Sequence, residues 1–402
     1  MKKQELLSLV ERKKERAIAL RRQIHADPEL SGKEYRTAAL VQGELDRLQI
    51  PYRTWSDYTG VVGLIAGAAE GPVIALRADM DALPISEART ELPFCSQNPG
   101  VMHACGHDVH TAVLLGAAAV LKELAPRLHG SVKLLFQPSE ECGPNGADQM
   151  VKRGCMQDPR VDRVFGLHVD DGRPCGALGT RAGAINASCD AFRIEVTGRS
   201  AHGTRPQNGV DAIYTACQMI LSLYAMTARR LSALERVSVN VGTVSGGTAS
   251  NIVADRAEFS ISLRTVSEET RAYMHREIRQ LLEDTARLNR AEVRISMREG
   301  ARTQFNDAES VERIARMAEL LYGKNAYTEN ADPSMGSEDF SAYCRDGTPG
   351  AMWELGVRNE EKGWTAALHN DRFCPDERAI PIGMAMQSAI VYSLLGADGM
   401  EA

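Results

Sequence analysis

The segment Met102–His110 carries the densest set of metal-binding side chains in this sequence. Three histidines, a cysteine and an aspartate surround Gly106. Imidazole, thiolate and carboxylate groups are the ligands that a borderline-soft divalent metal prefers. Cys105 and His107 place two donors close together but do not complete a coordination shell. A lone cysteine beside a helix is commonly a small core residue, so a metal site needs partners elsewhere in the chain.

Further donors lie near the ends of predicted strands. Carboxylates follow the strand-like runs 72–78 and 131–137, and a histidine lies near the end of 163–169. In an open α/β sheet, sites form beyond the carboxyl ends of the strands, so we expect these groups to converge. Each of them also has a structural interpretation, as a cap, a turn or a buried polar group. The candidates are Asp79, Asp81, Glu140, Glu141, His168 and, in a short segment far downstream, His369.

A set of five donors is predicted from these positions: Cys105, His107, Glu141, His168 and His369. A single catalytic zinc keeps about three protein ligands and a water, so five donors favour two divalent metal ions that share a water. Glu140 is then the natural general base and acid. Adjacent residues of an extended segment point to opposite sides, so Glu141 can bind metal while Glu140 faces the substrate.

Strands that alternate with helices predict an α/β layered sheet in the first part of the chain. Two helices are expected at about 4–26 and 33–48, and Ser31 with Glu34 is typical of a capping box at the start of the second. The remaining predicted helices span about 109–124, 147–153 and 382–395. The predicted strands are 60–66, 72–78, 131–137 and 163–169.

The pattern changes near residues 184–190. From there to about Phe305 the chain reads as strand, helix, two strands, helix and strand, at 191–197, 210–229, 237–244, 257–265, 268–287 and 292–299. This β-α-β-β-α-β order is typical of a ferredoxin-like α+β sandwich. We therefore expect a discontinuous domain, 1–184 and 302–402, and an inserted domain, 185–301.

Composition narrows the class of protein. A chain of 402 residues is expected to form two domains, and a net charge of −6 argues against nucleic-acid or anionic-membrane partners. The longest apolar run, Thr111–Leu121, is too short to span a bilayer. The N-terminus leads into a charged segment and not into an apolar signal. Nine cysteines without Cys-x-x-Cys spacing favour a reducing cytoplasm.

Seven ordered motifs resemble the M20 family of metallopeptidases and amidohydrolases. Its closest branch holds N-acyl-amino-acid amidohydrolases, hippurate hydrolases, N-acetyl-diaminopimelate deacetylases and auxin-conjugate hydrolases. The resemblance implies a di-metal peptidase-like catalytic domain, with a mixed sheet between helices, and an inserted dimerisation or lid domain. The motifs are Arg77–Pro84, Met102–His110, Glu140-Glu141, Gly166–Val169, Ser200–Gly203, Met335–Phe340 and Leu368–Asn370.

The resemblance assigns the five donors above to the metals and Glu140 to the general base. Asp81 matches an aspartate that orients a neighbouring histidine, whereas Asp79 stands where other branches carry a histidine ligand and is expected to support the site from outside. His202 matches a histidine that stabilises the oxyanion in the partner subunit's site. Asn251 and Arg264 resemble positions that hold the substrate's carboxylate. Asp108 is expected to hold a ligand histidine.

The resemblance implies hydrolysis of an N-acyl amino acid or short peptide by a homodimer, or a dimer-based homo-oligomer. The metals are zinc, manganese, cobalt or nickel, all of which tolerate these donors. A dipeptidase or carboxypeptidase, or a deacetylase of the N-acetyl-diaminopimelate type, stays open on the same scaffold. Two other classes also stay open: a Cys105 nucleophile activated by His107, and a metal- or ligand-binding relative without turnover. Gln207 and Cys374 depart from the usual motifs, which leaves substrate preference open.

Overall fold

The computed structural model describes residues 1–142 and 145–401, and the chain divides into two compact units. The first unit comprises Met1–Gly183, Phe305–Ala331 and Ala342–Ala402, and the second comprises Ala184–Gln304 and Asp332–Ser341. The sequence places 332–341 with the catalytic domain. The structure groups this stretch with the second unit because its backbone bonds there, as in the Ser334 bridge to Asn186.

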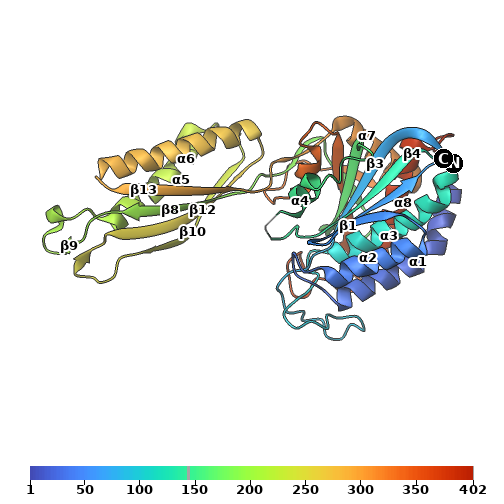
Figure 1. The fold of residues 1–402 in the computed structure, drawn as a ribbon, viewed down its shortest axis with the longest axis horizontal. Coiled ribbons are helices and arrows are strands. Elements are labelled where there is room, and N and C mark those ends of the chain that lie inside the picture. The colour runs from blue at the N-terminus through green and yellow to red at the C-terminus, as the bar shows by residue number, and fades with distance from the viewer. Residues whose placement is uncertain (143–144, 402) are drawn as a thin grey trace. The chain divides into compact units, whose positions relative to one another are not determined.

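An eight-stranded mixed sheet forms the middle of the first unit (Figure 1). Its strands lie in the order β1-β2-β4-β3-β5-β16-β6-β15, and β4, β3, β5 and β16 run parallel to one another. Parallel strands covered on both faces read as apolar runs, which is why β3, β4 and β5 were visible in the sequence. The strands are β1 (Tyr52–Trp55), β2 (Tyr58–Ala66), β3 (Ala69–Asp79), β4 (His129–Gln137), β5 (Arg163–Pro174), β6 (Leu178–Thr180), β15 (Tyr327–Glu329) and β16 (Gly350–Arg358).

Helices cover this sheet in two layers. Helices α3 and α8 pack against strands β3 and β4 and against each other, and α1 packs across both helices. The predicted α/β fold with a large mixed sheet is confirmed. The helices of this unit are α1 (Lys3–Ala26), α2 (Tyr35–Arg47), α3 (His107–Leu124), α4 (Gly146–Lys152), α7 (Ala308–Tyr322) and α8 (Ala379–Leu395).

Helix α3 extends beyond both ends of the apolar run Thr111–Leu121. Together with the 3₁₀ helix η1 (Ala125–Arg127) it forms a 21-residue segment that by length and composition alone could cross a membrane, and 78% of its apolar window is buried inside the fold. The apolar run Thr111–Leu121 is only the middle part of this segment. Within the fold, α3 is buried on nearly every side by α1, α8 and the sheet. A helix that is apolar all round suits such a central position.

The second unit is a four-stranded antiparallel sheet with two helices. The sheet order β10-β12-β8-β13 and the chain order β8-α5-β10-β12-α6-β13 are those of a ferredoxin-like sandwich. Asp211 caps α5 and Ser267 caps α6, each accepting a backbone N–H three residues on. The elements are β8 (Asp190–Thr197), α5 (Ala212–Arg230), β10 (Val237–Gly246), β12 (Arg256–Thr265), α6 (Glu268–Leu288) and β13 (Glu292–Glu299).

The predicted capping box at the start of α2 is wrong. Neither Ser31 nor Glu34 caps the helix, which has no side-chain bond from its N-cap residue. Glu29 does this instead, because its Oε2 accepts the N–H groups of Arg36 and Thr37, both at 2.9 Å. The first four N–H groups of a helix have no partner within the helix, so a nearby carboxylate can accept from them, and the chain path brings Glu29 to two of them.

Candidate metal centre and active site

A glycine turn presents the two donors of the Met102–His110 segment. Gly106 has φ +82°, and a Cβ at this position would lie 2.5 Å from Cγ2 of Val169. Only glycine fits both the left-handed backbone and this approach. The turn lets His107 open helix α3, two residues earlier than predicted, while Cys105 stays in the preceding loop.

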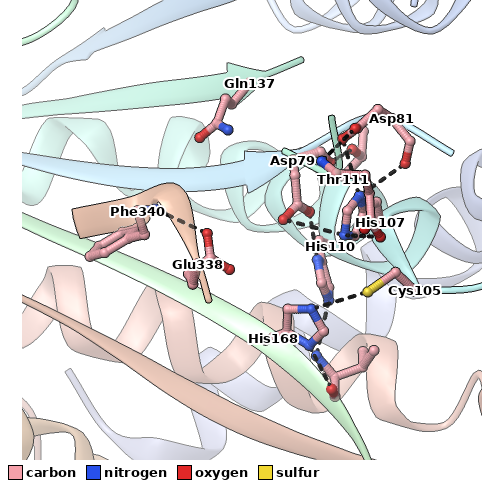
Figure 2. Close-up of polar contacts among 12 residues, drawn as sticks. Asp79, Asp81, Cys105, His107, His110, Thr111, Gln137, His168, Glu338 and Phe340 are labelled. Carbon is pink, nitrogen blue, oxygen red and sulfur yellow. Dashed lines mark hydrogen bonds and ion pairs between the residues drawn. The ribbon is translucent and has the colours of Figure 1, made fainter. Parts of the chain in front are cut away.

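The structure brings the five predicted donors together (Figure 2 shows three of them). The Sγ atom of Cys105 lies 3.5 Å from His168 Nε2 and 3.3 Å from His369 Nε2. Oε1 of Glu141 lies 3.4 Å from His369 Nε2 and 3.9 Å from His107 Nε2. His168 lies within β5, which continues past the predicted end of that strand, and His369 has a left-handed φ of 62°.

The orientation of the imidazole rings fits metal binding. Nδ1 of His107 donates to the carbonyl oxygen of Asp81 at 2.9 Å, and Nδ1 of His168 donates to that of Val169 at 2.7 Å. In a neutral ring the proton is then on Nδ1, so each Nε2 presents a lone pair to the other donors. Nε2 of His107 and Oε1 of Glu141 are buried without a hydrogen bond within the described residues. Such facing lone pairs fit a cation between them.

The electrostatics of the centre favour added positive charge. Burial lowers the pKa of His107, but the charge of Asp79 and the hydrogen bond with Asp81 outweigh it and hold the pKa well above its ordinary value. Burial raises the pKa of the Cys105 thiol well above its ordinary value. A nucleophilic cysteine needs a lowered pKa, so this surrounding disfavours the Cys105 nucleophile. A bound metal would displace the thiol proton.

Asp79 and His110 lie next to the metal donors and are held by hydrogen bonds to other parts of the protein. Asp79 ends β3, accepts from Arg77 at 2.7 Å and from His110 Nδ1 at 2.6 Å, and lies 3.7 Å from His107 Nε2. Nε2 of His110 accepts the Val169 N–H at 2.9 Å. Burial lowers the pKa of His110 to about 4, so the ring is neutral near neutral pH. With both nitrogens bonded to protein, His110 has no lone pair for a metal.

Asp81 lies where an orienting aspartate would. Its Oδ1 is 3.3 Å from Nδ1 of His107, and its Oδ2 accepts from the N–H of Glu141 at 2.9 Å and from the hydroxyl of Ser31 at 2.6 Å. Asp81 therefore contacts two metal-ligand candidates, the imidazole ring of His107 and the backbone N–H of Glu141. Ser31 was missed as part of this centre, because its sequence context indicated a local helix cap.

Glu140 lies beside the metal-ligand candidates. A carboxylate oxygen of Glu140, one of Glu141 and a ring nitrogen of His107 all lie within 4.8 Å of one another. Glu140 and Glu141 follow β4, whose parallel neighbour β3 ends at Asp79, so the two strand ends meet at one edge of the sheet. This places a carboxylate where it could take a proton from a water that metals on the neighbouring donors would hold.

Asp108 does not hold a ligand histidine, contrary to the prediction. Its Oδ2 forms an ion pair with Nε of Arg21 at 2.7 Å and accepts from Nδ1 of His25 at 2.8 Å, and all three side chains are buried. Burial raises the pKa of Asp108, but the charges of Arg21 and His25 outweigh it and hold the pKa far below its ordinary value. Asp108 therefore ties the start of α3 to α1 through a buried ion pair.

The other three predicted residues belong to the second unit. His202 is exposed in the short strand β9 (Ala201–His202), and its Nδ1 bonds with Thr204 at 2.9 Å. Asn251 is exposed beside β11 (Ile252–Val253). Arg264 lies in β12, and its Nη1 donates to the Met335 carbonyl at 2.9 Å. Their predicted roles toward substrate stay predictions.

Comparisons with known proteins decide the family. The sequence profile of Peptidase family M20/M25/M40 matches residues 75–393. The chain belongs to this family. It is 36% identical to thermostable carboxypeptidase 1 of Saccharolobus solfataricus, over 94% of each chain. It is also 36% identical to N-acetyl-L-cysteine deacetylase of Bacillus subtilis, over 90% of this chain and 84% of that one.

A solved structure supports the same assignment. A dinuclear metal-binding peptidase of the M20 family from Bacillus subtilis superposes with a TM-score of 0.81 at 30% identity, over 95% of this chain and 98% of that chain. The chain is thus a metal-dependent amidohydrolase or peptidase, and its donor set supports two divalent metal ions.

Proposed function

We propose that the protein hydrolyses the amide bond of N-acyl amino acids. The observation that carries this proposal is the closeness of Glu140 to two of the five converging metal donors, His107 and Glu141. Hydrolysis of an unactivated amide needs an acidified water, a polarised carbonyl and a proton for the leaving amine. Two divalent metals, when bound, supply the Lewis acidity for the first two needs. Glu140 takes the proton from the attacking water and passes it to the amine nitrogen.

The donor types restrict the metal. One thiolate, three imidazoles and one carboxylate suit zinc, manganese, cobalt or nickel, and disfavour magnesium and calcium, which prefer oxygen ligands. The four candidates are distinguished by measuring the bound metals of protein purified without added metal, and then by restoring activity after chelation with each ion singly.

The free carboxylate of the substrate would be bound by Arg264 and Asn251. Arg264 donates one Nη1 bond to the Met335 carbonyl, which fixes the guanidinium in place. A guanidinium carries five N–H donors and can hold a carboxylate bidentately. Arg264→Lys should raise KM for N-acyl amino acids while kcat changes little. With a substrate amidated at this carboxylate, wild type and Arg264→Lys should have the same KM.

A homodimer would complete the site with His202 from the partner subunit. Helix α5 exposes an apolar face that includes Ile213, Tyr214, Leu221 and Tyr224. The edge strand β10 carries neither charge nor proline along Val237–Gly246. Unguarded edges pair with other strands, and an apolar face beside such an edge suits a second copy of the same unit.

Matched substitutions test the dimer. The Leu221 side chain is 70% exposed on α5, and that of Leu288 is 78% exposed at the end of α6. Light scattering should show a monomer for Leu221→Asp and an intact dimer for Leu288→Asp. A dimeric Leu221→Asp protein would contradict this interface. Equal co-expression of His202→Ala and Glu140→Gln subunits should restore about a quarter of wild-type activity, since half the dimers then hold one complete site. No restoration would refute the action of His202 across the interface.

A substrate panel tests the function itself. N-acetyl and N-benzoyl amino acids, dipeptides and N-acetyl-diaminopimelate would be compared before chelation, after chelation and after metal return. Glu140→Gln should keep its metals and lose most turnover. Preference for dipeptides would favour a carboxypeptidase or dipeptidase, as the relative in S. solfataricus is named. Bound metal with no hydrolysis of any amide would mark a binding protein. We also propose a cytoplasmic location, because all nine cysteines are free thiols.

A further inference from the structure

Glu34 is a buried carboxylate whose bonds reach far along the chain. It precedes α2 and has no exposed surface. Its Oε1 accepts the N–H of Gly32 at 2.8 Å and the N–H of Ser139 at 3.0 Å, and its Oε2 accepts the hydroxyl of Thr59 at 2.7 Å. Three donors on one buried carboxylate make a rigid anchor, since a charged acceptor strengthens each bond.

Ser139 is the residue directly before Glu140, and its backbone is unusual. It has φ +57°, a left-handed conformation that is strained for a residue other than glycine. Its carbonyl accepts the N–H of Gly146 at 3.0 Å, and a Cβ on Gly146 would lie 1.6 Å from the Pro138 carbonyl oxygen. The bend at Ser139 therefore sets the direction in which the chain leaves β4 and presents Glu140.

The residue after Glu140 is fixed by the same short segment of chain. Ser31 donates to Oδ2 of Asp81, and that oxygen also accepts the N–H of Glu141. Glu34 holds the backbone on one side of Glu140, and Ser31 acts through Asp81 on the other side. Together they bracket the residue that the proposed reaction uses as its base.

We propose that Glu34 is a positioning residue, which fixes the left-handed bend at Ser139 and so aims the Glu140 carboxylate. This role rests on the proposed function of Glu140 as the base. A misplacement of about 1 Å at a reacting group can cost 100-fold in rate. The effect is therefore expected in kcat, while metal binding by the five donors and substrate binding are retained.

Glu34→Ala tests the anchor, and Glu29→Ala is the matched control. Both glutamates are buried in the same segment, but Glu29 caps α2 and has no side-chain bond to residues 138–142 or 145, the described part of the loop that carries Glu140. With N-acetyl-L-methionine and N-benzoylglycine as probes, Glu34→Ala should lower kcat by about 10- to 100-fold with KM within about twofold. Glu29→Ala should keep kcat within about threefold. Glu34→Gln keeps an acceptor oxygen for Ser139 and should recover most of the rate.

Two further readouts separate positioning from damage. Metal content should be equal in wild type, Glu34→Ala and Glu29→Ala. The double variant Glu34→Ala/Glu140→Gln should have the same kcat as Glu140→Gln alone. A residue that acts only by positioning the Glu140 carboxylate has no further effect once that carboxylate is removed. Amide exchange at Ser139–Glu141, followed by mass spectrometry without substrate, should rise at least about tenfold in Glu34→Ala and stay unchanged in Glu29→Ala.

The results discriminate clearly. Equal kcat values in Glu34→Ala and Glu29→Ala, additive losses in the double variant, or unchanged exchange at Ser139 would each overturn the positioning role. If Glu34→Ala does not fold, Glu34→Asp, which withdraws the carboxylate by about one bond length, takes its place under the same criteria. A wild type inert toward every amide would instead refute the proposed function, and the exchange measurement would still test the anchor.

Discussion

Substitution of Gly106 by alanine should break the metal centre by a calculable strain. Gly106 joins Cys105 to His107 with φ +82°, and an added Cβ meets Cγ2 of Val169 at 2.5 Å. The left-handed conformation costs an alanine about 1–2 kcal/mol. Carbon atoms pack at about 3.5–4.0 Å, so Val169 or the turn must move by about 1 Å, at a further cost of about 1–3 kcal/mol. We expect a total destabilisation of about 2–5 kcal/mol.

The same displacement should weaken metal binding. Val169 follows the donor His168 and accepts its Nδ1–H, so a shift of Val169 moves a ligand together with the Cys105–His107 turn. We expect metal affinity to fall by about 10- to 100-fold, as when supporting contacts of metal ligands are lost. Metal affinity would be measured by competition with a chromogenic chelator, and stability by urea unfolding of the metal-free protein.

Gly154→Ala is the control for this prediction. Gly154 has φ +79°, but nothing lies within 4 Å of its added Cβ. It should show only the conformational cost of about 1–2 kcal/mol, with unchanged metal affinity. Adding Val169→Ala to Gly106→Ala should restore part of the lost affinity by removing the clash. If Gly106→Ala unfolds like Gly154→Ala and binds metal like wild type, the strain argument is refuted.

Three further predictions concern the stability of the folded protein. Lys133→Met should destabilise the protein by at least about 2 kcal/mol in urea unfolding at unchanged kcat, because the buried ammonium donates to the carbonyls of Cys155, Gln157 and Pro159 at 2.9, 2.8 and 2.7 Å; equal stability would contradict this. Burial raises the pKa of Asp190, but bonds from Arg271 and His275 outweigh it and hold the pKa below its ordinary value of 3.8. A lowered folded-state pKa contributes stability above the unfolded value that is lost as pH falls through the folded value. The stability difference between wild type and Asp190→Asn should therefore be full above about pH 5 and shrink below pH 3.8, and a difference independent of pH would argue against the pair. Chelation should lower the unfolding midpoint, and metal returned at 100 times its Kd should restore about 2.7 kcal/mol; an unchanged midpoint would mean that the donors bind no metal in the folded state.

Much of the fold was readable in the sequence, because its signals are local. Buried parallel strands appear as apolar runs and amphipathic helices as periodic ones, and β8, β13 and α6 were predicted within one or two residues. Short strands were not predicted: β6 and β15 have only three residues each and exist because neighbouring strands pair with them. The length of α3 was underestimated, since a histidine-rich start does not read as an apolar helix.

The types of the metal donors and the strand ends that carry them were determined by the sequence alone. Strand ends meet at one edge of a parallel sheet by geometry, so residues far apart could be grouped without knowing any contact. The partners of charged groups were decided only by tertiary structure. Glu34 and Asp108 each lie beside a helix start where a local bond was plausible, yet Glu34 bonds to Ser139 and Asp108 to Arg21. A buried carboxylate pairs with the donors that the fold places beside it, and these donors can lie anywhere in the sequence.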